Sequence, residues 1–218
     1  YMFLDDTACN LASLNLLPFY DEKTKRFDDQ AYRHAVRLWT TVLEISVVMA
    51  QFPSKEIARR SYDYRTLGLG YANLGSLLMV MGLAYDSAEG RSVAAALSAI
   101  LTGEAYAQSG RMAAAWGPFA RYEANRESML RVMRNHARAA RGAPAAEYVG
   151  LTVLPIGLEA SACPANLVAA ARDSWDQALA IGEKSGYRNA QVSAIAPTGT
   201  IGLLMDCDTT GVEPDFAL

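Results

Sequence analysis

Residues 191–211 read QVSAIAPTGTIGLLMDCDTTG, and this stretch decides which kind of fold the chain can form. It begins as a short apolar run, which predicts a buried strand over 191–195, and the sequence PTGT at 197–200 then interrupts that run. A glycine-containing loop with hydroxyls at the end of a strand can direct successive backbone N–H groups at an anion. Tight turns also favour such residues, so the pattern alone leaves both interpretations open. The loop lacks the lysine that follows in a Walker A motif.

The remainder of the chain is dominated by helical patterns. Apolar residues recur at helical spacing from Asp28 to Gln51 and stop before Pro53. Alternating residues predict a short strand within 8–19, and the mixed charges of 21–29 indicate a solvated hairpin or loop. We predict further helices over 54–64, 69–82, 87–116, 121–141 (as one or two exposed helices) and 166–185, with a linker-like segment over 142–157.

Composition restricts the class of protein. The 218 residues are 51% hydrophobic and 20% charged, which is enough to bury a core. A net charge of −3 argues against a nucleic-acid polymer as partner, and no apolar run of 18 residues predicts a membrane span. Three scattered cysteines suit a reducing cytoplasm better than a disulfide framework. Because the sequence starts at Tyr1 without a methionine, we expect an internal piece, a single domain over 1–218 truncated at both ends.

Several other candidate sites are set aside. The glycines of GLGYANLG (68–75) fall where helical periodicity has begun, so they indicate close helix packing rather than a dinucleotide-binding turn. His34 and His136 have no second metal ligand at helical spacing. Cys163 lies in a loop without chemical context, and Cys207 lies between two aspartates that disfavour its thiolate.

Three blocks of the sequence carry a family resemblance. They are DDTACNLASLNL (5–16), RTLGLGYANLG (65–75) and YRNAQVSAIAPTGTIGLLMDCDTTGVEPDF (187–216). Together they closely resemble the large catalytic subunit of ribonucleotide reductase, most of all its adenosylcobalamin-dependent branch. The resemblance runs from Tyr1 to Leu218. It implies that this helix-rich α/β chain is a fragment of a ten-stranded α/β barrel, which surrounds a finger loop bearing a thiyl-radical cysteine.

The resemblance also implies roles for individual residues. Cys9 would be one member of the redox-active cysteine pair, which reduces the substrate radical and then forms a disulfide. Residues 209–216 would be the next barrel strand, with Glu213 and Pro214 in structural roles. The substrate-phosphate loop would consist of Ala196, Pro197, Thr198, Gly199, Thr200 and Ile201.

The implied reaction replaces the 2′-hydroxyl of a ribonucleoside di- or triphosphate with hydrogen. Adenosylcobalamin would be the cofactor of the intact parent, and a dithiol such as thioredoxin the reductant; a homodimeric parent stays open. The family's Asn-Pro-Cys-Ser-Glu loop would end immediately before Tyr1, so we expect this chain alone to be inactive. Two alternatives remain: a diiron-partnered large subunit of the same family, and a non-enzymatic helical nucleotide-binding module in which 196–202 is only a turn.

Overall fold

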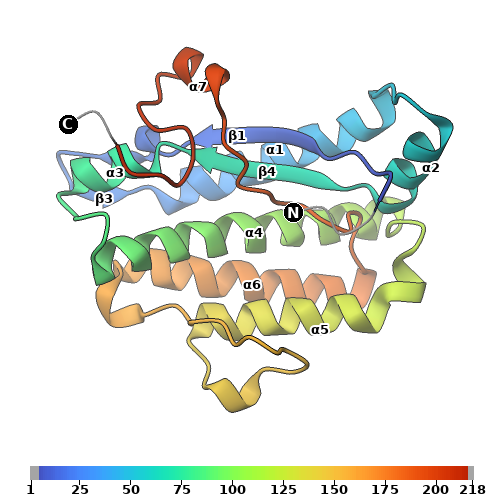
Figure 1. Cartoon of the computed structure of the whole chain (residues 1–218). Coiled ribbons are helices and arrows are strands. Elements are labelled where there is room, and N and C mark those ends of the chain that lie inside the picture. Colours follow the sequence, from blue (N-terminus) through green and yellow to red (C-terminus); the bar gives the residue numbers. More distant parts are fainter. Residues whose placement is uncertain (1–4, 216–218) are drawn as a thin grey trace.

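The computed structural model describes residues 5–215 and shows a helix-rich α/β arrangement (Figure 1). Strands β1 (Asn10–Asn15) and β4 (Leu67–Ala72) pair in parallel, with Asn10 opposite Leu67 and Asn15 opposite Ala72. The predicted strand over 191–195 is only partly formed: the segment runs along the other edge of β4 and makes an isolated parallel bridge between Leu69 and Ser193, with Ala194 N–H donating to the carbonyl of Leu69 (3.1 Å). The described residues therefore contain part of a parallel sheet, and a ten-stranded barrel stays a prediction.

Four long predicted helices are confirmed, and side-chain caps explain where three of them begin. The side chains of Asp28, Ser54 and Ser87 accept hydrogen bonds from backbone N–H groups of the first helical turns. The helices are α1 (Asp29–Met49), α2 (Lys55–Tyr64), α4 (Ala88–Trp116) and α6 (Ala165–Ser185).

The predicted helix over 69–82 is wrong in its first part. This segment forms strand β4, then Asn73 in a left-handed conformation (φ 72°), then helix α3 (Leu74–Met81). The sequence of the strand, Leu-Gly-Leu-Gly-Tyr-Ala, alternates large and small residues, which is the two-residue period of a strand. All six residues are buried, as in a strand covered on both faces. The glycines allow close approach of neighbouring chain, since a Cβ on Gly70 would come 2.6 Å from the carbonyl oxygen of Ala194.

The shorter predicted segments agree with the structure in part. Residues 21–29 contribute to a small hairpin formed by β2 (Tyr20–Asp21) and β3 (Arg26–Phe27). The segment 121–141 is one helix, α5 (Tyr122–Arg141), and it is not fully exposed because Leu130 and Met133 face the core. The remaining elements are the 3₁₀ turns η1 (Leu17–Phe19), η2 (Ala145–Glu147) and η3 (Ala160–Ala162), and helix α7 (Thr200–Leu204).

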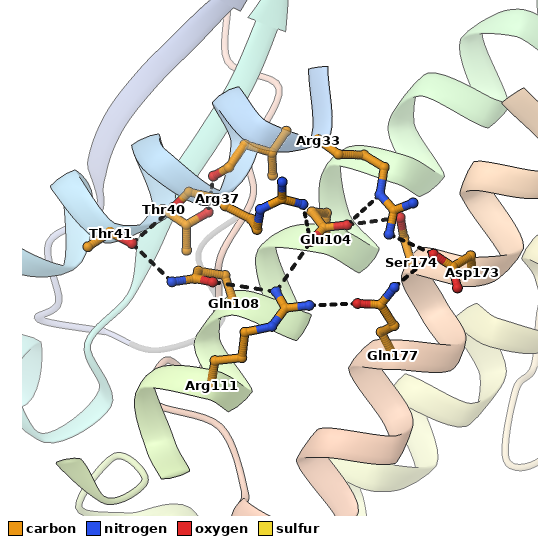
Figure 2. Close-up of polar contacts among 11 residues, drawn as sticks. Arg33, Arg37, Thr40, Thr41, Glu104, Gln108, Arg111, Asp173, Ser174 and Gln177 are labelled. Carbon is orange, nitrogen blue, oxygen red and sulfur yellow. Dashed lines mark hydrogen bonds and ion pairs between the residues drawn. The ribbon is translucent and has the colours of Figure 1, made fainter. Parts of the chain in front are cut away.

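The helices form a layer against the sheet, with α4 packed on both α1 and α6, and α5 packed on α6 (Figure 1). A buried carboxylate joins three of them. Glu104 of α4 has a fully buried side chain and binds Arg33 (2.7 Å) and Arg37 (3.1 Å) of α1, and Arg111 (3.3 Å) of its own helix (Figure 2). Arg33 also binds Asp173 of α6 (2.7 Å), so this network fixes the spacing of α1, α4 and α6.

The prediction of a barrel strand over 209–216 is wrong for the residues that the structure describes, which end at Asp215. This segment bends back on itself. The Asn73 side-chain oxygen accepts from the N–H groups of Asp208 (3.2 Å) and Thr209 (3.3 Å), and the Glu213 carboxylate accepts from the hydroxyl and N–H of Thr210. These bonds stand where strand pairing was predicted, and the contact of Glu213 is with Thr210 of the same bend.

No helix within residues 5–215 has both the length and the apolar character needed to cross a membrane.

Candidate functional site

The predicted phosphate loop begins where the segment 191–195 ends, beside strand β4. Gly199 adopts φ 65° and ψ −139°, a conformation that favours glycine, and α7 begins at the next residue. Thr198 N–H donates to the carbonyl of Thr210 (2.7 Å), which fixes the loop against the bend at 208–213. In Figure 1, α7 lies near the carboxyl ends of β1 and β4. This edge of a parallel sheet is where ligands commonly bind.

A groove of about 490 Å³ runs along the sheet to this loop. Its floor includes Leu11 and Ser13 of β1 and Gly68 of β4, and Trp39 of α1 also borders it. Four of the six predicted loop residues line it, namely Ala196, Pro197, Thr198 and Ile201. The volume is within the range of small-molecule sites.

The two loop hydroxyls differ in environment. Thr198 Oγ1 is buried and has no hydrogen-bond partner among the described residues. A buried hydroxyl normally has a partner, so this atom is a candidate ligand donor. Thr200 is exposed; neither Thr200 nor Gly199 lines the groove, although both belong to the same loop.

Cys9 lies at the start of β1 and is half-buried. Its thiol fills space that Gly68 leaves free, because a Cβ on Gly68 would lie 2.6 Å from Cys9 Sγ. Gly68 also lines the groove, whereas Cys9 is not among the lining residues, so the Cys9 thiol is connected to the groove only through Gly68. Burial raises the pKa of the Cys9 thiol, which therefore holds its proton at neutral pH.

The other cysteines and the histidines show no catalytic arrangement. All three cysteines are free thiols in the described part of the chain. Burial raises the pKa of Cys163 to about 11. Burial is also the largest cause of the raised pKa of Cys207, and Asp208 and Asp206 add to it in the predicted direction.

His136 stacks on Trp175 (5.0 Å between ring centroids). Within residues 5–215, no group of three or more His, Cys, Asp or Glu side chains could hold a metal.

Two asparagines that the sequence analysis missed connect the loop to the strands. Asn15 ends β1, and its amide N–H donates to the carbonyl of Met205, just after α7 (3.0 Å). Asn73 follows β4 and is fully buried; its amide donates to Asn15 Oδ1 (3.1 Å), and its backbone N–H donates to Thr209 (2.9 Å). The only sequence signal was that each asparagine directly ends or follows an apolar strand.

Gln191 is the other missed residue. Its side-chain amide donates to the carbonyl of Leu67 (3.2 Å) and to Cys9 Sγ (3.6 Å). Nothing in the local sequence predicts this contact, which joins positions 182 residues apart.

Comparison with known proteins identifies the family that this fold and site define. The family model described as "Ribonucleotide reductase, barrel domain" matches residues 1–218. The chain belongs to this family.

Particular relatives are similar over the whole chain. It is 65% identical to "Vitamin B12-dependent ribonucleotide reductase" of Agrobacterium fabrum and 63% identical to the protein of that name from Bradyrhizobium diazoefficiens. It is 26% identical, over 97% of its length, to "Vitamin B12-dependent ribonucleoside-diphosphate reductase" of Mycobacterium tuberculosis. The chain spans only 17% of the length of the first two relatives and 22% of the third.

Proposed function

We propose that this chain is part of a longer polypeptide that reduces ribonucleotides to 2′-deoxyribonucleotides by thiyl-radical chemistry. Its part of the work would be to bind the substrate phosphates and to supply one thiol of the redox pair. Family membership over all 218 residues supports the reaction class. The observation that carries the assignment of roles is Gly68, which borders both the Cys9 thiol and the groove that ends at residues 196–201.

The phosphate role rests on backbone donors and hydroxyls. The first N–H groups of a helix have no partner within the helix, and here Thr200 and Ile201 occupy those positions. Gly199 presents no side chain, and nothing lies within 4 Å of where its Cβ would be. Thr198 Oγ1 adds a donor without a partner among the described residues. Ala196 and Pro197 would form the groove wall that leads to these donors.

The redox role of Cys9 requires a thiol that keeps its proton until the substrate needs it. Two thiols become a disulfide, and their two electrons and two protons convert the 2′-hydroxyl to water and leave hydrogen on C2′. The raised pKa of Cys9 suits this step because the group carries both a proton and an electron. An external dithiol such as thioredoxin would then reduce the disulfide.

The names of the relatives support an adenosylcobalamin-dependent parent over a diiron-partnered one. The residues of this chain do not fit a complete corrinoid site. The groove of about 490 Å³ suits a molecule far smaller than a corrinoid. We therefore assign the cofactor contacts to other parts of the polypeptide, where the cofactor would supply the radical chemistry.

The proposal is tested with Cys9→Ser in the full-length polypeptide. With adenosylcobalamin and dithiothreitol, the wild type should turn over repeatedly, and the variant should still form the radical but lose multiple turnover. The variants Cys163→Ser and Cys207→Ser are matched controls and should retain steady-state rates. A normal steady-state rate for Cys9→Ser contradicts the redox role.

A further inference from the structure

The side chain of Gln191 reaches Cys9 across strand β4. Gln191 lies on one edge of this strand, where the Leu67 N–H donates to its carbonyl (2.9 Å). Cys9 precedes β1, which pairs with the other edge. Gln191 Nε2 nevertheless lies 3.6 Å from Cys9 Sγ, within hydrogen-bond reach of sulfur. The contact crosses the strand beside Gly68, which has no side chain to fill the space around the thiol.

The orientation of the Gln191 amide follows from its second contact. Nε2 also lies 3.2 Å from the carbonyl oxygen of Leu67, and a carbonyl oxygen can only accept. The NH₂ group must therefore face both Leu67 and Cys9, because the amide oxygen would repel the carbonyl. Gln191 is only 9% exposed, so little water competes for its second N–H.

We propose that Gln191 is a positioning residue, which holds Cys9 Sγ beside Gly68 and stabilises its thiolate by hydrogen bonding. This inference rests on the proposed redox role of Cys9. When an external dithiol reduces the disulfide between Cys9 and its partner cysteine, a thiolate of the dithiol attacks the sulfur of the partner cysteine. The S–S bond breaks, and Cys9 leaves as a thiolate with the electron pair. The dithiol's second thiol then releases the partner. The Gln191 N–H stabilises the departing thiolate until a proton returns.

Among the described residues, the Cys9 thiol shares no hydrogen bond or ion pair with a charged side chain. Residues 5–6, on the segment of Cys9 itself, are exposed aspartates, and Arg60 of α2 donates to the carbonyl of Asp5 (3.0 Å). Arg65, in the turn before β4, forms a buried ion pair with Glu44 of α1 (2.6 Å). Within the described residues the thiol thus has an amide donor and no bound cation.

The test is the pH dependence of Cys9 alkylation by iodoacetamide in the full-length, reduced polypeptide, followed by mass spectrometry of the Cys9 peptide. Replacing the donor in Gln191→Met should raise the pH midpoint by about one to two units, the size expected for losing one hydrogen bond to a charged group. Gln108→Met is the matched control, because that amide donates to Thr41 instead (3.2 Å). Its midpoint should equal that of the wild type.

Gln191→Asn provides a second, uncharged variant that keeps an amide but is one methylene shorter, so that its N–H group no longer reaches Cys9 Sγ, and it decides the question if Gln191→Met fails to fold. A raised midpoint in a folded variant supports the proposal, and an unchanged midpoint overturns it. The midpoint is measured on the free thiol, so it does not depend on disulfide formation during turnover. Normal turnover of Cys9→Ser would overturn the redox role while leaving the hydrogen bond established.

Discussion

The guanidinium of Arg65 and the carboxylate of Glu44 form a nearly inaccessible ion pair, with 2.6 Å between Nη2 and Oε1. Arg188 binds the same carboxylate oxygen (2.8 Å), and the Asn189 amide binds the other (2.6 Å). Glu44 belongs to α1, Arg65 precedes β4, and Arg188 and Asn189 lead into the segment 191–195. One carboxylate therefore fixes the position from which Gln191 extends toward Cys9.

Replacing this carboxylate should loosen the segment locally. In Glu44→Gln, two guanidinium groups lose their counter-charge, and breaking a buried pair costs about 3–5 kcal/mol. Hydrogen exchange of backbone amides in 186–193 should accelerate by about tenfold or more in the full-length polypeptide. Glu56→Gln is the control, since that carboxylate binds Arg59 and Arg60 at the exposed surface of α2. Equal exchange in Glu44→Gln and wild type would contradict the assignment.

Acid should weaken the packing of α1 on α4 through Glu104. Burial alone would raise the pKa of Glu104, but hydrogen bonds and charges from Arg33 and Arg37 outweigh it and lower the pKa below its ordinary 4.5. A carboxyl group with a lowered folded pKa contributes stability that is fully present above its unfolded pKa and is lost as pH falls through the folded value. The temperature of the thermal transition should therefore decrease as the pH falls below about 4.5.

Glu104→Gln separates this effect from general acid denaturation. The variant should melt at a lower temperature at pH 7 and should lose less stability between pH 7 and about pH 3, because the titrating group is gone. Transition temperatures measured across this range check both expectations. Parallel curves for variant and wild type would show that Glu104 is not the responsible group.

Gly68→Ala should displace the Cys9 thiol. The new methyl group would meet Cys9 Sγ at 2.6 Å and Leu11 Cδ2 at 2.3 Å. Overpacking of this kind costs about 1–3 kcal/mol. In a double-mutant cycle, Cys9→Ala should recover part of that loss, since it removes one of the two clashing atoms. If the two substitutions prove additive in denaturation measurements, the thiol does not occupy the space beside Gly68.

Thr198→Val should weaken nucleotide binding by about one to two powers of ten, the loss of one hydrogen bond to a charged group. Stability should change little, because Thr198 Oγ1 has no partner to lose among the described residues and valine preserves the shape. Thr200→Val should weaken binding by a similar factor if its exposed hydroxyl contacts the phosphates. Dissociation constants measured with the full-length polypeptide check both expectations. Unchanged values in both variants would show that the loop is only a turn and does not bind the phosphates.

Gly199→Val should impair binding more than either threonine substitution. The residue has φ 65°, which a β-branched side chain rarely adopts, and valine would project into the space proposed for the phosphates. The comparison uses the same binding measurement. Binding as tight as in the wild type would show that the loop backbone does not contact the nucleotide.

The sequence predicted those parts of the fold that local rules determine. The helical spacing of apolar residues and the stop before Pro53 placed α1 correctly, and the helices predicted from Ser54 and Ser87 begin one residue later, where those side chains cap them. Strand β4 was missed because its glycines obscure the two-residue period of a strand. Glycine is needed at these positions because residues distant in the sequence, such as Cys9 and Ala194, pack against them. The break at Pro197 and Gly199 was predicted, but Thr200 and Ile201 of the predicted loop belong to helix α7.

Contacts between segments that are distant in the sequence could not be predicted from the sequence. The Gln191–Cys9 bond and the Asn15–Asn73 bond exist only once parallel strands align, and no spacing in the sequence encodes that alignment. The bend at 209–215 was likewise missed because its donors bind to Asn73, which lies in another part of the chain.

The buried amide of Asn73 has a consequence for how a nucleotide would enter and leave. It bonds to Asn15, and to the backbone at 208–209, which flanks the loop. Swinging the loop outward as a lid would break these bonds, so traffic must instead pass along the open side of the groove. That side is bordered by Leu11 and Trp39, whose side chains are 59% and 41% exposed. A bound nucleotide would then leave by diffusion along the groove, without displacement of the loop.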